Sequence, residues 1–172
     1  MKKQFVPIML LAATLSACSG GDQATSEPMI TKTEIQVENG QFTPEIMHRL
    51  GKVGDVQVSP DHSKILYGVT YTSIEQNKGN RELYLMNVDG SNNVKITNTP
   101  KSESNARWLN DSQIIYMRSG KLYTATIEGA TLKNETEVAG AEGMESFELS
   151  PAGDKLMFIK SVKAAQKPTD IY

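Results

Sequence analysis

Side chains that could catalyse a reaction or bind a metal are sparse in this sequence. Its two histidines, His48 and His62, are 14 positions apart with no cysteine between them, which is poor spacing for a metal site. Aspartates recur at Asp61, Asp111 and Asp154, where their oxygens could bind calcium. Aspartates in turns more commonly bond their own backbone. We therefore expect surface or capping roles for the histidines, turn-forming roles for the aspartates, and no metal or cofactor site.

The cysteine Cys18 follows an apolar run at the N-terminus and is the only cysteine in the chain. Lys2 and Lys3 form a basic start, and the apolar run covers residues 5–15. That run is too short for a transmembrane helix, which needs about 20 residues. The pattern predicts a signal peptide over residues 1–17.

The residues directly before the cysteine, Leu15-Ser16-Ala17, resemble the lipobox of bacterial lipoproteins. We predict cleavage between Ala17 and Cys18 and attachment of lipid to the Cys18 thiol, which would anchor the protein to a membrane. The alternative is an ordinary cleaved signal in which Cys18 has no role. A lipid anchor predicts a location in the bacterial cell envelope, on the periplasmic or the outer-membrane face.

The segment after the predicted anchor, residues 18–41, is rich in polar and small side chains and predicts a flexible tether. Ile35 and Val37 alternate with polar neighbours and could add a short strand. The whole chain has 18 basic and 20 acidic side chains, and they are interspersed. A nucleic-acid partner is not expected, because it would require clustered lysines and arginines.

A pattern of a polar turn followed by an apolar strand recurs along the chain. Ser59–Tyr67 and Ser150–Phe158 share it, and Leu109–Tyr116 is a diverged copy. The aromatic ends of the three copies, Tyr67, Tyr116 and Phe158, are 49 and 42 positions apart. Self-similarity at this period in a strand-rich sequence is typical of β-propeller blades, each of four antiparallel strands.

Strand patterns fill the units between these copies. Thr43 and Pro44 predict a short helix that Gly51 ends. Residues 73–80 predict a loop, and Asp89-Gly90 predicts a hairpin turn. The predicted strands cover residues 53–58, 65–71, 81–88 and 94–97, then 106–109, 114–117, 121–127 and 135–138, then 146–149 and 155–160. The predicted fold class is all-β: residues 42–172 form an incomplete β-propeller of about two and a half four-stranded, WD40-like blades.

The same patterns predict which side chains are buried. Val56 and Val58 alternate with polar residues, as in a half-buried strand. Trp108 and the three repeated aromatic residues are expected between the blades. A ring of two and a half blades cannot close, so we expect further blades after Tyr172 to cover the exposed edge.

Several phrases resemble the propeller of the prolyl oligopeptidase family of serine peptidases, and within it the bacterial dipeptidyl-peptidases and acylaminoacyl peptidases. They are Thr43–Ile46, Val53–Asp61, Arg81–Tyr84, Asn87–Ser91 and the terminal Lys167–Tyr172. The resemblance covers about residues 42–172. It implies a propeller that caps an α/β-hydrolase domain with a Ser-Asp-His triad, admitting peptides and excluding folded proteins.

The catalytic residues of that family are not assigned to any position here. The Gly-x-Ser-x-Gly motif of a nucleophile elbow does not occur in the sequence, and both histidines come early. We therefore expect the non-catalytic N-terminal propeller segment of an exported, lipid-anchored serine exopeptidase, which gates peptide substrates for a hydrolase domain that follows it. One alternative is a lipoprotein propeller of the cell envelope that binds a partner without catalysis. Another is a truncated gene product without a stable fold.

Overall fold

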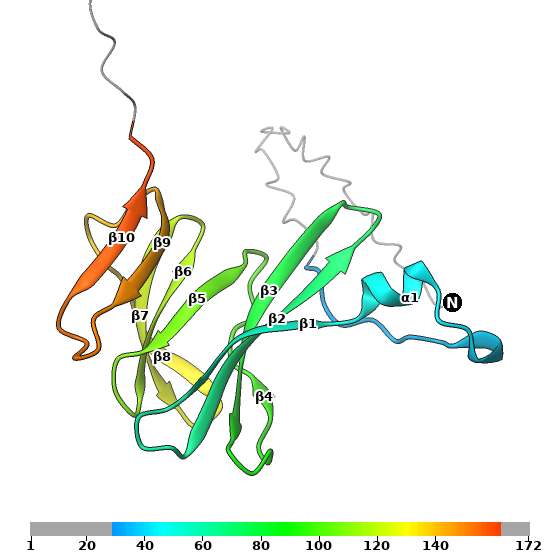
Figure 1. The fold of residues 1–172 in the computed structure, drawn as a ribbon, viewed down its shortest axis with the longest axis horizontal. Coiled ribbons are helices and arrows are strands. Elements are labelled where there is room, and N and C mark those ends of the chain that lie inside the picture. The colour runs from blue at the N-terminus through cyan, green and yellow to red at the C-terminus, as the bar shows by residue number, and fades with distance from the viewer. Residues whose placement is uncertain (1–28, 163–172) are drawn as a thin grey trace, which may run out of the picture.

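The computed structural model describes residues 29–162, which form three antiparallel sheets arranged side by side and one short α-helix (Figure 1). This confirms the all-β prediction. The predicted signal peptide, the cleavage site at Ala17 and Cys18, and the phrase Lys167–Tyr172 lie outside the described residues. Among the residues described, no helix is both long and apolar enough to cross a bilayer.

The segment before the first strand holds a 3-10 helix, η1 (Glu38–Gly40), and the α-helix α1 (Pro44–Arg49). The helix begins as predicted, because the Thr43 hydroxyl accepts a bond of 3.4 Å from the backbone N–H of Ile46. The strand considered at Ile35 and Val37 is not formed.

The role predicted for Gly51 is wrong. The helix ends at Arg49, and Leu50 already has extended backbone angles. A Cβ atom at Gly51 would lie 2.8 Å from the Val69 side chain and 3.0 Å from the Tyr71 ring. Glycine is required here by the close approach of the chain to the first sheet and not by the end of the helix.

The first sheet has the strand order β1-β2-β3-β4, with β1 (Lys52–Val58), β2 (Lys64–Ser73), β3 (Lys78–Asn87) and β4 (Val94–Lys95). The pairing of β2 with β3 continues without interruption until Ser73 faces Lys78. The loop predicted over residues 73–80 is therefore a tight turn, because both strands extend into it. The turn predicted at Asp89-Gly90 is confirmed, with Gly90 at a φ of 84°.

The strand predicted over residues 53–58 is formed, but the prediction that it is half-buried is wrong. Val53, Val56 and Val58 are 62%, 59% and 49% exposed. Asp55 has a φ of 50°, and the register of β1 against β2 shifts between Gly54 and Gln57. A bulge of this kind breaks the alternation on which the prediction rested.

The second sheet has the order β5-β6-β7-β8, with β5 (Glu103–Trp108), β6 (Gln113–Arg118), β7 (Lys121–Glu128) and β8 (Thr131–Glu137). The third sheet pairs β9 (Met144–Leu149) with β10 (Leu156–Lys160). The first strands of successive sheets contact one another, β1 with β5 and β5 with β9. β5 also contacts β2 and β3, so the first strand of the second sheet packs across three strands of the first sheet.

The hydrophobic core lies between the sheets. Leu66 and Leu83 of the first sheet pack with Ile114 and Tyr116 of the second, and Trp108 packs against this cluster. A second cluster joins Ile115 and Leu122 to Phe147 of the third sheet. The predicted burial of Tyr116 is thus confirmed.

Two other predicted core aromatic residues lie elsewhere. Tyr67 is buried, but it alternates with Leu66 along β2 and so lies on the face of the first sheet opposite the second. Phe158 is 49% exposed, so its prediction as a core residue is wrong. The third sheet has two strands among the described residues, and two strands provide too few neighbours to enclose this side chain.

Candidate functional site at the junction of the first two sheets

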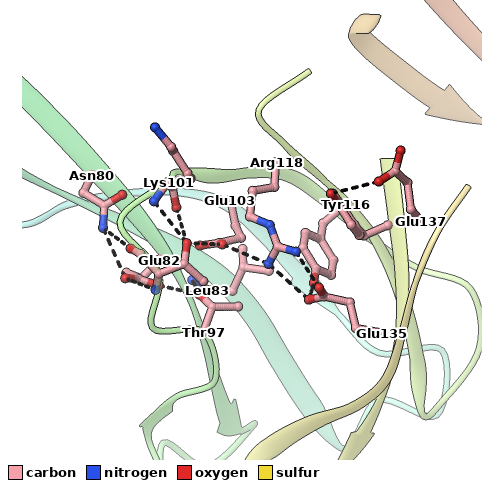
Figure 2. A network of polar contacts seen from close by, with 12 residues as sticks. Asn80, Glu82, Leu83, Thr97, Lys101, Glu103, Tyr116, Arg118, Glu135 and Glu137 are labelled. Carbon is pink, nitrogen blue, oxygen red and sulfur yellow. Dashed lines mark hydrogen bonds and ion pairs between the residues drawn. The ribbon is translucent and has the colours of Figure 1, made fainter. Parts of the chain in front are cut away.

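Two buried carboxyl groups lie at the junction of the first two sheets. Residues 96–102 connect β4 to β5 and so cross from one sheet to the next. Glu82 on β3 is 2% exposed and Glu103 at the start of β5 is 0% exposed. Figure 2 shows both within one network of polar contacts that extends to Arg118 and Glu135.

The carboxylate of Glu82 is fully supplied with hydrogen-bond donors. One oxygen accepts bonds from the Asn80 amide at 3.2 Å and from the backbone N–H of Thr99 at 3.1 Å. The other accepts a bond of 2.7 Å from the Thr97 hydroxyl, which itself accepts one from the N–H of Leu83 at 2.8 Å. This pattern suits an ionised carboxylate, which accepts only.

The carboxyl group of Glu103 has far fewer partners. Its Oε1 lies 2.8 Å from the Thr99 hydroxyl and 3.7 Å from Nη1 of Arg118. Its Oε2 is buried without a hydrogen-bond partner among the described residues. Burial raises the pKa of Glu103 to about 7; the hydrogen bond from Thr99 acts in the opposite direction, and the negative charge of Glu82 adds to the rise.

The guanidinium group of Arg118 is held mainly by a different carboxylate. It forms two hydrogen bonds with Glu135, and its centre lies 4.3 Å from the ring centroid of Tyr123. The Tyr116 hydroxyl also donates to Glu135. Burial opposes the charged form of Glu135, but the bonds from Arg118 and Tyr116 outweigh it and lower the pKa of Glu135.

These groups can hold protons and bind the two sheets together, but they do not form a nucleophile with its base. The carboxylates at 82 and 135 are occupied by donors, and the hydroxyls of Thr97 and Thr99 bond to carboxyl or backbone oxygens. Sequence reasoning missed Glu82, Glu103 and Arg118 as a group. The available signal was a charged residue directly before the apolar run Leu83–Met86, and it does not say what the charge contacts.

The predicted turn role of Asp61 is confirmed. Its carboxylate accepts bonds from the Ser63 N–H at 3.0 Å and the Ser63 hydroxyl at 2.7 Å, as well as one from Ser59. These bonds lower the pKa of Asp61 to about 2, and the bond from Ser59 makes the largest contribution. His62 sits in the same turn with a φ of 59°.

The other copies of the turn use the same bonds with different residues. In the third copy, the Ser150 N–H donates to the Lys155 carbonyl, and the Ser150 hydroxyl accepts from the Lys155 N–H and donates to Asp154 at 2.7 Å. Ser59 makes the same bonds with Lys64 and Asp61 in the first copy. Gly153, with a φ of 69°, occupies the place of His62. In the middle copy Asn110, and not the predicted Asp111, accepts the bonds from the following N–H groups.

The three aspartates therefore belong to three separate turns. Within residues 29–162, no three histidine, cysteine, aspartate or glutamate side chains come together as a metal site. His48 is exposed on α1.

Comparison with known proteins identifies the kind of protein to which this segment is related. No family model matches the sequence. Over 134 residues the chain is 30% identical to Dipeptidyl-peptidase 5 of Porphyromonas gingivalis, which covers 76% of this chain and 20% of that protein. It is 24% identical over 143 residues to Dipeptidyl-peptidase 5 of Porphyromonas endodontalis, covering 80% of this chain and 20% of that protein. The chain contains a dipeptidyl-peptidase-related segment. It spans about a fifth of the length of the curated relatives it matches.

Proposed function

We propose that this chain is the N-terminal β-propeller segment of an exported, lipid-anchored serine exopeptidase of the dipeptidyl-peptidase type. The observation that carries the proposal is the similarity to two dipeptidyl-peptidases over most of the described residues. The segment itself would be non-catalytic. Peptide hydrolysis would belong to an α/β-hydrolase domain outside these 172 residues, and the propeller would limit access to it.

The arrangement of the sheets supports a propeller. In both four-stranded sheets the strands follow sequence order, and the second and third strands carry a stacked tyrosine pair. Tyr67 faces Tyr84 with ring centroids 5.5 Å apart, and Tyr116 faces Tyr123 at 6.0 Å. Contacts between first strands, as in β1-β5-β9, are those expected around a central axis.

The faces left open by these sheets support a larger assembly in the whole protein. Met157 on β10 is 67% exposed and Ile159 is 58% exposed. The equivalent residues on β6, Ile115 and Met117, are buried by the third sheet. Further blades of the whole protein would cover β10 in the same way.

The peptidase proposal is tested with the gene that encodes this chain. The reading frame beyond Tyr172 is expected to continue for hundreds of codons and to contain Gly-x-Ser-x-Gly followed by aspartate and histidine. The encoded protein is expected to release p-nitroaniline from dipeptidyl substrates, and the 172-residue chain is not. Turnover by the 172-residue chain would contradict its non-catalytic role. A frame that closes after a few more blades would instead favour an envelope lipoprotein that binds a partner.

The lipid anchor is a separate part of the proposal and has its own test. The chain is expected to incorporate an alkyne analogue of palmitate and to remain in the membrane fraction, and Cys18→Ser is expected to abolish both. Ser19→Ala is the matched control, because it leaves the thiol in place. Unchanged labelling of Cys18→Ser would show that Cys18 does not carry the lipid.

A further inference from the structure

The hydroxyl of Thr99 has more hydrogen-bond partners than a single proton can serve. It lies 3.1 Å from the backbone N–H of Lys101, from which it accepts, and 2.7 Å from the carbonyl oxygen of Lys101. It also lies 2.8 Å from Oε1 of Glu103. Both oxygens are acceptors if Glu103 is ionised, and one hydroxyl hydrogen can satisfy only one of them.

A proton on Glu103 removes this conflict. The carboxyl O–H of Glu103 then donates to Thr99, and the Thr99 hydroxyl donates to the carbonyl of Lys101. The remaining Oε2 becomes a neutral carbonyl oxygen, which is less costly to bury unpaired than half of a carboxylate. Glu82, with three donors, has no need of the proton.

We propose that Glu103 is a neutral carboxylic acid in the folded chain and makes the contact between the first two sheets pH-dependent. Loss of its proton loosens this contact. Residues 96–102 and β5 are both tied to this carboxyl group, through Thr99 and through the start of the strand. A negative charge on Glu103 would face Glu82 in a site from which water is excluded. This inference does not depend on the proposed peptidase role.

The surrounding charges do not supply Glu103 with a full counter-ion. Arg118 approaches it at 3.7 Å but makes its hydrogen bonds to Glu135. Two further basic side chains close to β5 each form an ion pair with an acidic side chain other than Glu103. The pairs are Arg81–Asp55 on β3 and β1, and Arg107–Glu148 on β5 and β9. Among the charged and titratable groups on the elements packed against β5, those that act on Glu103 are Glu82 on β3 and Tyr116 and Arg118 on β6.

The direction of the pH effect follows from proton binding. The folded chain binds the Glu103 proton more tightly than the unfolded chain, in which a glutamate has its ordinary pKa of 4.5. The stabilisation by this proton is fully present below that value and is lost as the pH rises through about 7. The contact between the sheets is therefore expected to weaken between mildly acidic and mildly alkaline pH.

The direct test is a carboxyl-carbon NMR titration of the whole chain, which needs no variant. The Glu103 signal is expected to titrate with a midpoint near pH 7. A midpoint near the ordinary value of 4.5 would overturn the proposal.

The second test follows the junction itself through Trp108, the only tryptophan in the chain, which packs against the cluster between the sheets. Its fluorescence is expected to shift to the red as the pH rises from 6 to 8. Glu103→Gln, a permanently neutral analogue, is expected to abolish the shift, and the exposed control Glu128→Gln is expected to retain it. His48 and His62 are present in all three proteins, so an unchanged shift in Glu103→Gln would assign it to other groups and overturn the proposal.

Discussion

Truncation of Leu66 tests whether the stability of this protein comes from the core between its first two sheets. Leu66 has no exposed surface and faces Leu85 of β3 in the strand pairing, and it packs with residues of both sheets. Leu66→Ala removes buried methyl groups from a site whose walls are fixed by strand pairing, so the cavity cannot collapse fully. We expect a loss of about 3 kcal/mol in the free energy of unfolding, within the range of about 2–5 kcal/mol for such substitutions.

The assay is urea unfolding of the whole chain, followed by Trp108 fluorescence and by far-ultraviolet circular dichroism. Ile114→Val, at another fully buried site of the same cluster, removes one methylene and is expected to cost about 1 kcal/mol. Because this loss is small, the stability of Ile114→Val can be measured even if Leu66→Ala does not fold. Met157→Ala is the matched control, because its side chain is 67% exposed, and it is expected to change stability by less than about 0.5 kcal/mol. Equal losses in Leu66→Ala and Met157→Ala would refute the reasoning.

Two further predictions concern hydrogen bonds to carboxylates. Tyr116→Phe removes a donor to Glu135, so it is expected to raise the pKa of Glu135 in an NMR titration and to cost about 1 kcal/mol in urea unfolding; an unchanged pKa would contradict this. Ser59→Ala removes the main bond to Asp61, so the pKa of Asp61 is expected to rise from about 2 toward 3.8, whereas Ser150→Ala should leave it unchanged. The lowered pKa of Asp61 stabilises the fold at pH values above the ordinary carboxyl pKa, and this stabilisation is lost as the pH falls through about 2. The Ser59→Ala protein is therefore also expected to unfold at a higher pH during acid unfolding.

The local features of the fold could be predicted from the sequence because their causes lie within a few residues. Thr43 caps a helix whose first N–H groups are nearby, and Asp61 bonds to Ser59 and Ser63 in its own turn. The recurrence of the turn near Ser150 then indicated a repeated strand unit, which the three antiparallel sheets contain.

Burial was less predictable, since it depends on what covers each face. The valines of β1 alternate correctly in the sequence, but the bulge at Asp55 and the open face of the first sheet leave them exposed. Phe158 occupies the same repeat position as Tyr116, yet only Tyr116 lies between two four-stranded sheets. Identical patterns thus acquired different environments.

The sequence by itself therefore determined the strands, the turns and the relation to dipeptidyl-peptidases, all of which depend on the order of neighbouring residues. The tertiary structure alone decided the junction of Glu82, Glu103 and Arg118, which come from three strands in two sheets. The charge state of a buried carboxyl group depends on the water it has lost and on the donors that other segments bring to it. Neither quantity exists until the chain between β4 and β5 crosses from one sheet to the next.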